Sequence, residues 1–392
     1  MHFVRLAAIL SLAAAPLAAQ GNAFYANPSA TTGIQFRSYQ FGSGAAYDKI
    51  SQFAIPIAVA IPITSKLAVD VGTYYGSTSA TPSGGAKQTL SGLTDAQVRG
   101  AYVFSDALVA TLTLNLPTGT KFDSTQAQAA GASASNWLLF PVNSFANGFS
   151  ATAGVAGTRH VGAWNLGVAL SGRLNSNFKP VSGDSLSYKP GFEGRVRVGV
   201  DRLIGPSRLT LGLTFSTYGD DAFGSGAGAQ QHYSPGQRFI GEASFTGPGL
   251  GGTITGYAWD YFRAAGDTSG LSTGNRENIL TAGAAHRIPL SRGATLESVA
   301  EARILSQQGG GSGVLIGLGT GVRMRVSDRF TLVPSARIDL GNANFPGGGS
   351  ASVSGVSATA LIQYNFEQTQ SAEPSACQNG GLPMAGRRSL GA

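Results

Sequence analysis

The sequence has little charge, almost no cysteine and no long hydrophobic run after its first residues. Only 12% of the 392 residues are charged, and Cys377 is the one cysteine, so no disulfide can form within the chain. Soluble domains usually have about a quarter of their residues charged. A transmembrane helix needs about 18 or more consecutive apolar residues. The longest candidate, 53–63, contains Pro56 and Pro62, which disfavour a helix.

The first residues have the pattern of a secretory leader. Arg5 precedes an apolar stretch from Leu6 to Leu12, and small residues continue to Ala19. This order of basic, apolar and small residues is that of a cleavable signal peptide, and its apolar part is too short to cross a bilayer. We therefore expect residues 1–21 to be a signal peptide.

Apolar and polar residues alternate along the rest of the chain. Between Gly313 and Leu340, every second residue is apolar from Val314 to Val326, and the pattern restarts at Phe330. A period of two indicates strands with two chemically different faces. The same pattern predicts strands at approximately 33–42, 50–63, 66–76, 94–104, 107–117, 148–160, 163–174, 190–201, 207–218, 237–247, 251–264, 277–288, 294–306, 313–326, 329–341 and 353–366.

The gaps between these segments alternate in length. Short turns such as Thr64-Ser65 and Ser327-Asp328 alternate with long polar stretches such as 118–147. Amphipathic strands of about ten residues, joined in this way, are typical of a transmembrane β-barrel, which leaves no backbone group unpaired in lipid. An all-β sandwich or propeller would also bury an apolar face, but it would not sort its loops into two length classes.

We therefore predict an all-β fold: a transmembrane antiparallel up-and-down β-barrel over residues 22–366, in the bacterial outer membrane. The expected number of strands is about sixteen, with fourteen as the alternative. The long loops are expected to be extracellular and the short turns periplasmic. Residues 367–392 follow the last strand and are expected to form a disordered periplasmic tail.

Charged residues fall mainly on the strand face opposite the apolar one. An arginine on the lipid face near the bilayer centre costs about 2–4 kcal/mol, so the charged face is expected to line the lumen. The charged groups either form ion pairs that hold the wall or bias a water-filled pore weakly towards anions. The expected basic residues are Arg99, Arg173, Arg195, Arg197, Arg208, Arg238, Arg287, Arg303, Arg323, Arg325 and Arg337. The expected acidic residues are Asp70, Asp95, Glu193, Asp201, Glu242, Asp260, Glu277, Glu297, Glu301 and Asp339.

The stretch from Thr118 to Asn147 contains an apolar cluster that is out of place in an exposed loop. Such a cluster usually marks an inward-folded segment or a ligand surface. We predict that residues 136–145 constrict the extracellular mouth or form an apolar ligand site. The alternative is that they extend the next strand or dock on another loop. The large apolar residues of the cluster are Trp137, Leu138, Leu139, Phe140 and Phe145.

Catalytic machinery is not recognisable in the sequence. His160, His232 and His286 have no serine or acid at a spacing that indicates a catalytic pair. Asp220 and Asp221 share a loop with His232, but its glycine-rich surroundings favour a solvated loop. No metal-ligand spacing or nucleotide-binding glycine run is present. We expect no enzyme activity, no metal and no cofactor.

Two short stretches resemble known transporter families. The block Gly92–Phe104, followed by Leu114-Asn115-Leu116-Pro117-Thr118-Gly119, resembles outer-membrane transporters of the phenol-degradation meta-pathway type, which are related in architecture to FadL long-chain fatty-acid channels. The stretch Gly21–Ala30 is similar to the Asn-Pro-Ala region near the start of FadL-like proteins. However, too few residues precede the first strand for a FadL-type plug, and sixteen strands exceed the fourteen typical of that family. The resemblance implies passive uptake of small hydrophobic compounds, with the cluster from Trp137 to Phe145 as the docking place.

The expected function is therefore an outer-membrane channel for passive diffusion or uptake of small molecules, hydrophobic ones included. A general polar porin is one alternative, and a structural or surface-display barrel without transport is another. The expected partners are outer-membrane lipid, small-molecule solutes and the barrel-assembly machinery during biogenesis. The net charge of +7 is spread along the chain, so nucleic acid is not expected as a partner.

Overall fold

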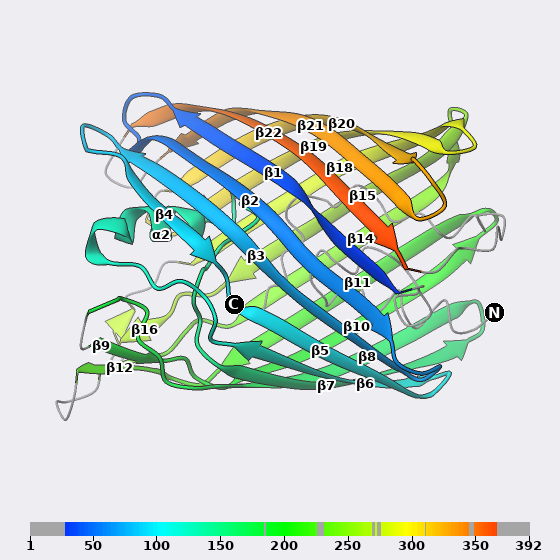
Figure 1. Cartoon of the computed structure of the whole chain (residues 1–392), viewed down its shortest axis with the longest axis horizontal. Coiled ribbons are helices and arrows are strands. Elements are labelled where there is room, and N and C mark those ends of the chain that lie inside the picture. The colour runs from blue at the N-terminus through cyan, green and yellow to red at the C-terminus, as the bar shows by residue number, and fades with distance from the viewer. Residues whose placement is uncertain are drawn as a thin grey trace.

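The strands of the chain form a barrel. The computed structural model describes residues 28–183, 186–225, 231–268, 271–272, 276–309, 311–344 and 349–366. The expected signal peptide and C-terminal tail lie outside these residues. Figure 1 shows the strands running obliquely to the long axis of the molecule. The barrel strands are β1 (Ser29–Phe41), β2 (Tyr47–Pro62), β3 (Leu67–Pro82), β4 (Gln88–Leu93), β5 (Ala96–Ser105), β6 (Leu108–Leu116), β7 (Ser150–Val161), β8 (Trp164–Asn175), β10 (Glu193–Ile204), β11 (Ser207–Tyr218), β14 (Arg238–Gly249), β15 (Gly252–Arg263), β18 (Glu277–Ser291), β19 (Ala294–Gln307), β20 (Ser312–Arg325), β21 (Phe330–Asn344) and β22 (Ser350–Asn365).

The barrel is antiparallel throughout and closed. Successive barrel strands pair with one another, and β1 pairs with β22 to complete the ring. β4 and β5 are two parts of one strand position, because β3 pairs with β5 near one end and with β4 near the other. With this broken strand counted once, the ring has 16 strands. The predicted barrel is confirmed, with the higher of the two predicted strand numbers.

The break between β4 and β5 lies at Thr94 and Asp95. The Tyr74 amide donates a hydrogen bond to the Thr94 hydroxyl at 3.0 Å. The Asp95 amide donates to the carbonyl of Phe145 at 3.0 Å. The broken strand therefore bonds, at this point, to a segment that belongs to the long connection between β6 and β7.

One end of the barrel has tight turns and the other has long, partly structured connections. Gly162 and Gly205 begin two of the tight turns with φ of 57°, the left-handed conformation that short hairpins require. The connections at the other end contain elements that the strand pattern did not predict. These are η2 (Ser124–Gln126), α2 (Ala127–Ser133), β9 (Leu186–Lys189), β12 (Asp221–Ser225), β13 (Gln231–Tyr233), β16 (Asp267–Thr268) and β17 (Leu271–Ser272). No helix within the described residues has the length and hydropathy to cross a bilayer.

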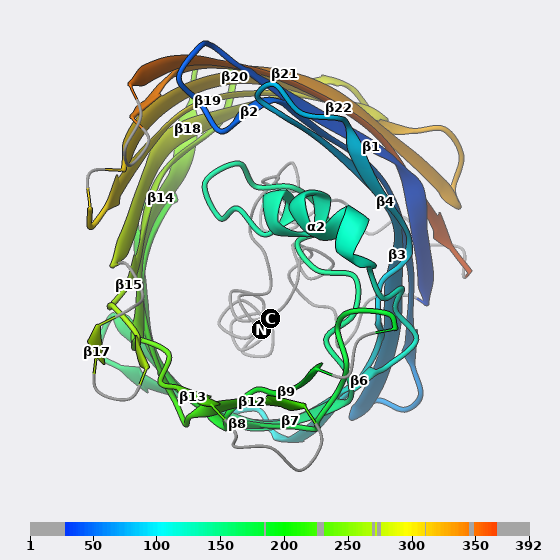
Figure 2. The ribbon, with the colours of Figure 1, turned by 90° about the vertical axis from the view of Figure 1, so that its left-hand side faces the viewer.

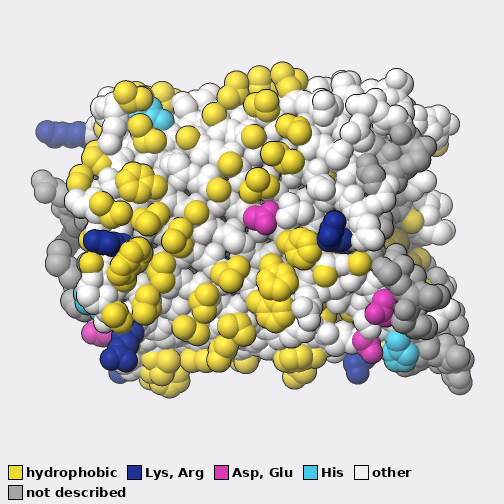
Figure 3. All heavy atoms as spheres, turned by 180° about the vertical axis from the view of Figure 1, so that it is seen from behind, with side chains coloured by type: hydrophobic (Ala, Val, Ile, Leu, Met, Phe, Trp, Pro, Cys, Tyr) yellow, Lys and Arg dark blue, Asp and Glu magenta, His cyan; other side chains and the backbone are white. Residues whose placement is uncertain are grey.

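The outside of the barrel is apolar. Large side chains such as Leu170, Val198 and Ile316 are about half exposed on it, and Figure 3 shows hydrophobic side chains spread over much of one side. Exposing so much apolar surface to water would be unfavourable by roughly 25 cal/mol per Å². A closed barrel with an apolar exterior is the arrangement of proteins of the bacterial outer membrane.

One residue expected to line the lumen faces lipid instead. Asp260 pairs with Gly241 on β14 and with Leu280 on β18, and Leu280 is exposed on the outer side. The prediction for Asp260 was wrong because the inner face of β15 is itself rich in aromatic residues. Trp259 on that face pairs with the inward-facing Glu242, so hydrophobicity did not distinguish the two faces of this strand.

Candidate functional site

Residues 136–145, named here the inner segment, lie inside the ring of strands. Figure 2 views the barrel from its long-loop end and shows α2 and the coil after it within the ring. The large apolar side chains of the inner segment are only 1–5% exposed. The structure thus places Trp137, Leu138, Leu139, Phe140 and Phe145 together in the interior rather than in an exposed loop.

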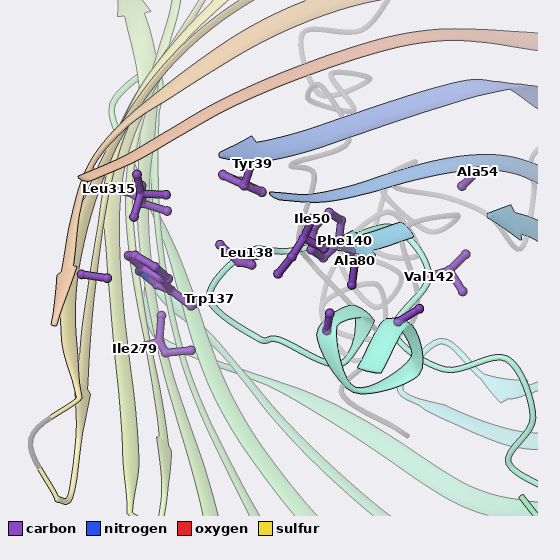
Figure 4. Close-up of a cluster of buried hydrophobic side chains, with 14 of the residues drawn as sticks. Tyr39, Ile50, Ala54, Ala80, Trp137, Leu138, Phe140, Val142, Ile279 and Leu315 are labelled. Carbon is purple, nitrogen blue, oxygen red and sulfur yellow. The ribbon is translucent and has the colours of Figure 1, made fainter. Parts of the chain in front are cut away.

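The inner segment packs on an apolar part of the inner wall. In Figure 4, Trp137 lies beside Leu315 of β20 and Ile279 of β18, while Phe140 lies close to Ile50 of β2. Gly313 leaves room for the indole, because an added Cβ there would lie 2.7 Å from Cζ2 of Trp137. The aliphatic side chains that point inward at these strands therefore have a partner, and they are not exposed to a water-filled lumen.

A short helix directs the chain into the barrel. Asp123 caps the turn η2 by accepting a hydrogen bond from the Thr125 amide at 2.8 Å, and the Gln126 side chain accepts one from the Asp123 amide at 3.1 Å. This reciprocal pair is a capping box, which stabilises the start of a helix. Ser133, the last residue of α2, donates to the carbonyl of Asn143 at 3.3 Å, so the helix is tied to the inner segment that follows it.

Two arginines of the wall hold the main chain of the inner segment. Arg303 on β19 donates to the Trp137 carbonyl at 2.6 Å. Arg37 on β1 donates to the Leu138 carbonyl at 3.1 Å and also to the Leu139 carbonyl. Both arginines are almost fully buried. Three consecutive carbonyls thus accept charged hydrogen bonds, which are stronger than bonds between neutral groups.

Polar contacts fix both ends of the inner segment. The Gln52 side chain on β2 donates to the Val142 carbonyl at 2.6 Å and accepts from the Val142 amide at 2.7 Å. At the other end, the Asn136 amide group lies 3.5 Å from the Tyr261 hydroxyl and 3.4 Å from Glu277. These contacts extend from β15 and β18 through β19 and β1 to β2. The inner segment therefore follows the wall around part of its circumference.

The bend in the inner segment has a strained residue. Leu139 has φ of 56°, and a residue with a Cβ in the left-handed region costs about 1–2 kcal/mol. Arg37 accounts for the persistence of this conformation, because its guanidinium holds the carbonyls of both Leu138 and Leu139.

Four predicted lumen residues form one ion-pair network beneath the inner segment. Arg303 lies 2.9 Å from Asp339 and 3.2 Å from Glu301. Arg337 lies 2.8 Å from Asp339 and 2.9 Å from Glu301, and the Tyr39 hydroxyl donates to Asp339 at 3.1 Å. Charges this deeply buried require partners, since removing one leaves an uncompensated charge. The network supports Arg303 and, through it, the inner segment.

A second network lies on the wall formed by β10, β11 and β14. Glu193 pairs with Arg195 at 2.7 Å and with Arg238 at 2.8 Å, and Arg197 pairs with Glu242. The remaining predicted lumen residues are distributed along the barrel. Three ion pairs lie inside the barrel, Arg99–Asp70, Arg208–Asp201 and Arg287–Glu297, and a fourth, Arg325–Asp328, lies at the short-turn end. The other three residues make different contacts: Arg173 donates a hydrogen bond to Ser150, Arg323 faces inward beside Thr295, and Glu277 lies near Asn136.

Asp95 faces inward but is sealed by the connection between β6 and β7. It accepts hydrogen bonds from the Gly119 amide at 2.8 Å, the Asn147 amide at 2.6 Å and the Asn115 side chain at 3.0 Å. Both ends of the long connection are thereby attached to one carboxylate. Asp95 therefore anchors the connection that contains the inner segment.

Arg37 and Gln52 are the important residues that the sequence reading missed. The signal was present, because alternation in 33–42 places Arg37 opposite Ile34 and Phe36, and alternation in 50–63 places Gln52 opposite Phe53. Neither was recognised as an inward-facing polar residue, because each is next to a large apolar residue in the sequence. What they bind, the main chain of a loop about a hundred positions away, has no signature in the sequence.

Asp221, in the long-loop connections, and His160 and His286, on barrel strands, are the acidic and histidine residues that remain to be placed. Asp221 accepts hydrogen bonds from the Tyr188 hydroxyl at 2.6 Å and from the Gly191 amide at 2.7 Å. Burial first, and then this bond to Asp221, raises the pKa of Tyr188. His160 pairs with Asn165 at 2.8 Å, and His286 faces outward opposite Ser298. Within the described ranges, no group of three or more His, Cys, Asp or Glu residues could hold a metal ion.

Comparison with known proteins finds similarity in fold but not in sequence. No family model matches the chain, and no curated protein matches it. Solved structures similar to it include a FadL homologue from Pseudomonas aeruginosa (TM-score 0.47, 9% identity, covering 90% of this chain and 94% of that one). They also include a mutant of the TodX monoaromatic hydrocarbon channel (TM-score 0.46, 9% identity, 92% and 94% covered) and the CymD monoaromatic hydrocarbon channel (TM-score 0.46, 10% identity, 87% and 89% covered). The similarity of the chain to these outer-membrane channels is one of fold.

Proposed function

We propose that the protein is an outer-membrane channel for the passive diffusion of small molecules, apolar ones included, and that the inner segment narrows its lumen. The observation that carries this proposal is the set of hydrogen bonds from Arg37, Arg303 and Gln52 to the main chain of the inner segment. These bonds depend on the position of the segment and not on its side chains. A barrel that needed only a stable wall would have no use for a segment fixed in this way.

The wall behind the inner segment favours apolar solutes. Ile50, Ile279 and Leu315 point inward and are at most 3% exposed, whereas a pore filled with water is lined by polar side chains. If the inner segment moved away from these three wall residues, apolar surface would be uncovered both on the wall and on the inner segment. A small apolar solute that replaced these contacts would gain roughly 25 cal/mol per Å² of area removed from water.

One observation favours a general polar porin as the second candidate. The wall away from the inner segment directs Thr113, Thr152, Ser171 and Thr214 inward, together with the network around Glu193. Water and polar solutes can hydrogen-bond to such a wall. A polar porin would use this wall and would not depend on movement of the inner segment.

Uptake by cells distinguishes the candidates. The protein is expressed in Gram-negative cells that lack their own porins, and entry of a labelled monoaromatic hydrocarbon is compared with entry of a sugar of similar mass. The proposed function predicts that the protein accelerates entry of the hydrocarbon more than entry of the sugar. Replacing the inner segment by a Gly-Ser stretch of equal length should open the channel to the sugar. Rapid sugar entry through the unaltered protein, without a gain for the hydrocarbon, would establish the polar porin.

A further inference from the structure

The lipid-facing side of β15 and β18 carries polar groups inside the apolar exterior. Asp260 and Asn278 both face outward, and the Asn278 side chain donates a hydrogen bond to the Asp260 carboxylate at 2.8 Å. Figure 3 shows this side of the barrel, with an acidic side chain among the hydrophobic ones. A carboxylate in this position is unfavourable in lipid unless something compensates its charge.

The depth of Asp260 follows from its aromatic neighbours. Phe215, Phe239 and Phe262 form an outward-facing row across three strands, with ring centroids 4.9 Å and 6.2 Å apart. Aromatic rows of this kind mark the level of the membrane interface. Asp260 lies one outward position closer to the short-turn end than Phe262, beside the exposed Leu280. Its carboxylate is therefore on the hydrocarbon side of the aromatic row.

Within the described residues, Asp260 has no ion-pair partner in its own chain. Arg276 immediately precedes β18 and is exposed. The alternation of β18 places it on the same outer side as Asn278. The face thus presents one acidic and one basic residue near its long-loop end without pairing them to each other.

The wall beside this pair carries a row of small side chains. Ala243, Ala258, Ala282 and Ala302 stand in register across four neighbouring strands and all face outward. Large residues such as Leu170 and Ile316 form much of the rest of the exterior, although Ala336 and Ala358 make a shorter small-residue pair on β21 and β22. Small side chains at a protein surface in a membrane allow a second surface to approach closely.

We propose that this face, formed by β14, β15, β18 and β19, packs against the same face of a second copy of the chain, with Asp260 of each copy paired to Arg276 of the other. A two-fold axis along the membrane normal places residues of the two copies that lie at the same depth opposite each other, and every contact between the copies then occurs twice. Along β18, Arg276 lies two outward positions nearer the long-loop end than Leu280, the residue paired with Asp260, and in the proposed dimer the long arginine side chain bridges this difference in depth. The phosphate groups of surrounding lipid are negatively charged, like Asp260, and would not supply the missing charge.

Charge-swap variants test the pairing. The molecular mass of the folded protein is measured by light scattering in mild detergent and by native mass spectrometry from lipid nanodiscs. The unaltered protein should be a dimer. Asp260→Arg and Arg276→Asp should each raise the dissociation constant at least tenfold, and the double variant should restore the dimer. Heat-dependent migration in SDS gels confirms that each variant has folded as a barrel.

Steric variants test the face independently of charge. Ala282→Trp should abolish the dimer, whereas Ala358→Trp, which faces outward and is exposed on β22, should leave it unchanged. A folded protein that stays monomeric at every concentration in nanodiscs would overturn the proposal. So would a double charge variant that dimerises no better than the single variants, or a dimer that Ala282→Trp does not affect.

Discussion

Arg37 on β1 donates a hydrogen bond from Nη1 to the main-chain carbonyl of Leu138 at 3.1 Å, across 101 positions of the sequence. The same guanidinium binds the carbonyl of Leu139, whose φ of 56° forms the bend of the inner segment. One buried arginine of the wall thereby helps to hold, inside the barrel, a segment that is about a hundred positions away in the sequence.

Replacing Arg37 should release the inner segment. Arg37→Ala leaves two buried carbonyls without their donor, at a cost of about 1–3 kcal/mol each, and removes the contact that holds the bend. We expect a higher single-channel conductance and larger current fluctuations in planar bilayers. Arg325→Ala is the matched control, because Arg325 is 43% exposed and pairs with Asp328 near the short-turn end. Equal conductance of the Arg37 variant and the wild type would contradict the role given to Arg37.

Gly313 should be intolerant of even a methyl group. In Gly313→Ala the new Cβ would lie 2.7 Å from the Trp137 ring, so the indole must move away from β20. In a background with Trp164 and Trp259 replaced by Phe, fluorescence of the remaining Trp137 should shift to longer wavelength. Gly100→Ala, where no atom lies within 4 Å of the added Cβ, should leave the spectrum unchanged. An unshifted spectrum in the Gly313 variant would show that the indole does not pack there.

Asp339 should be critical for stability. Asp339→Asn leaves Arg303 and Arg337 with Glu301 as their remaining carboxylate, and breaking a buried ion pair costs about 3–5 kcal/mol. The midpoint of urea unfolding in detergent micelles should fall clearly. Asp328→Asn, at a side chain that is 70% exposed, should change stability by less than about 1 kcal/mol. Similar midpoints for both variants would argue against a structural role for the network.

The small sheet formed by β9, β12 and β13 at the long-loop end should become less stable at high pH. Burial and the hydrogen bond to Asp221 raise the pKa of Tyr188 above its ordinary value of 10.0, which means that the fold favours the neutral phenol. The stabilisation is complete below the ordinary pKa and is lost as the pH rises through the raised pKa. The absorbance of tyrosinate is measured against pH for the wild type and for Tyr188→Phe, and the difference between the two reports Tyr188 alone. This difference should appear at a higher pH than the ionisation of an exposed tyrosine. A difference spectrum that titrates near the ordinary pKa would contradict this.

The barrel was predictable because its signal is repeated in every strand. Alternation in a stretch such as Gly313–Leu340 follows directly from lipid on one side and protein or water on the other, and tight turns separate the strands. The same rule failed at Asp260, because aromatic residues such as Tyr257 make the inner face of β15 as apolar as its outer face. The break at Asp95 was also missed, since its amide bonds to the Phe145 carbonyl and not to a strand.

The candidate site was predictable only in part. Trp137 and Phe140 indicated an inward-folded segment because large apolar residues are costly in an exposed loop. The path of that segment along the wall depends on hydrogen bonds from Arg37 and Gln52 to main-chain atoms. Main-chain carbonyls are the same in every residue, so no pattern of side chains in the sequence could reveal which of them these two residues bind.

The measurement that tests the central claim most directly is the single-channel conductance of the refolded protein, compared with a variant in which residues 136–145 are replaced by a Gly-Ser stretch of equal length. If the inner segment constricts the lumen, the unaltered protein should show a small conductance, and the variant a conductance several times larger. A large conductance that is the same in both proteins would contradict the account, because the inner segment would then lie along the wall without narrowing the path.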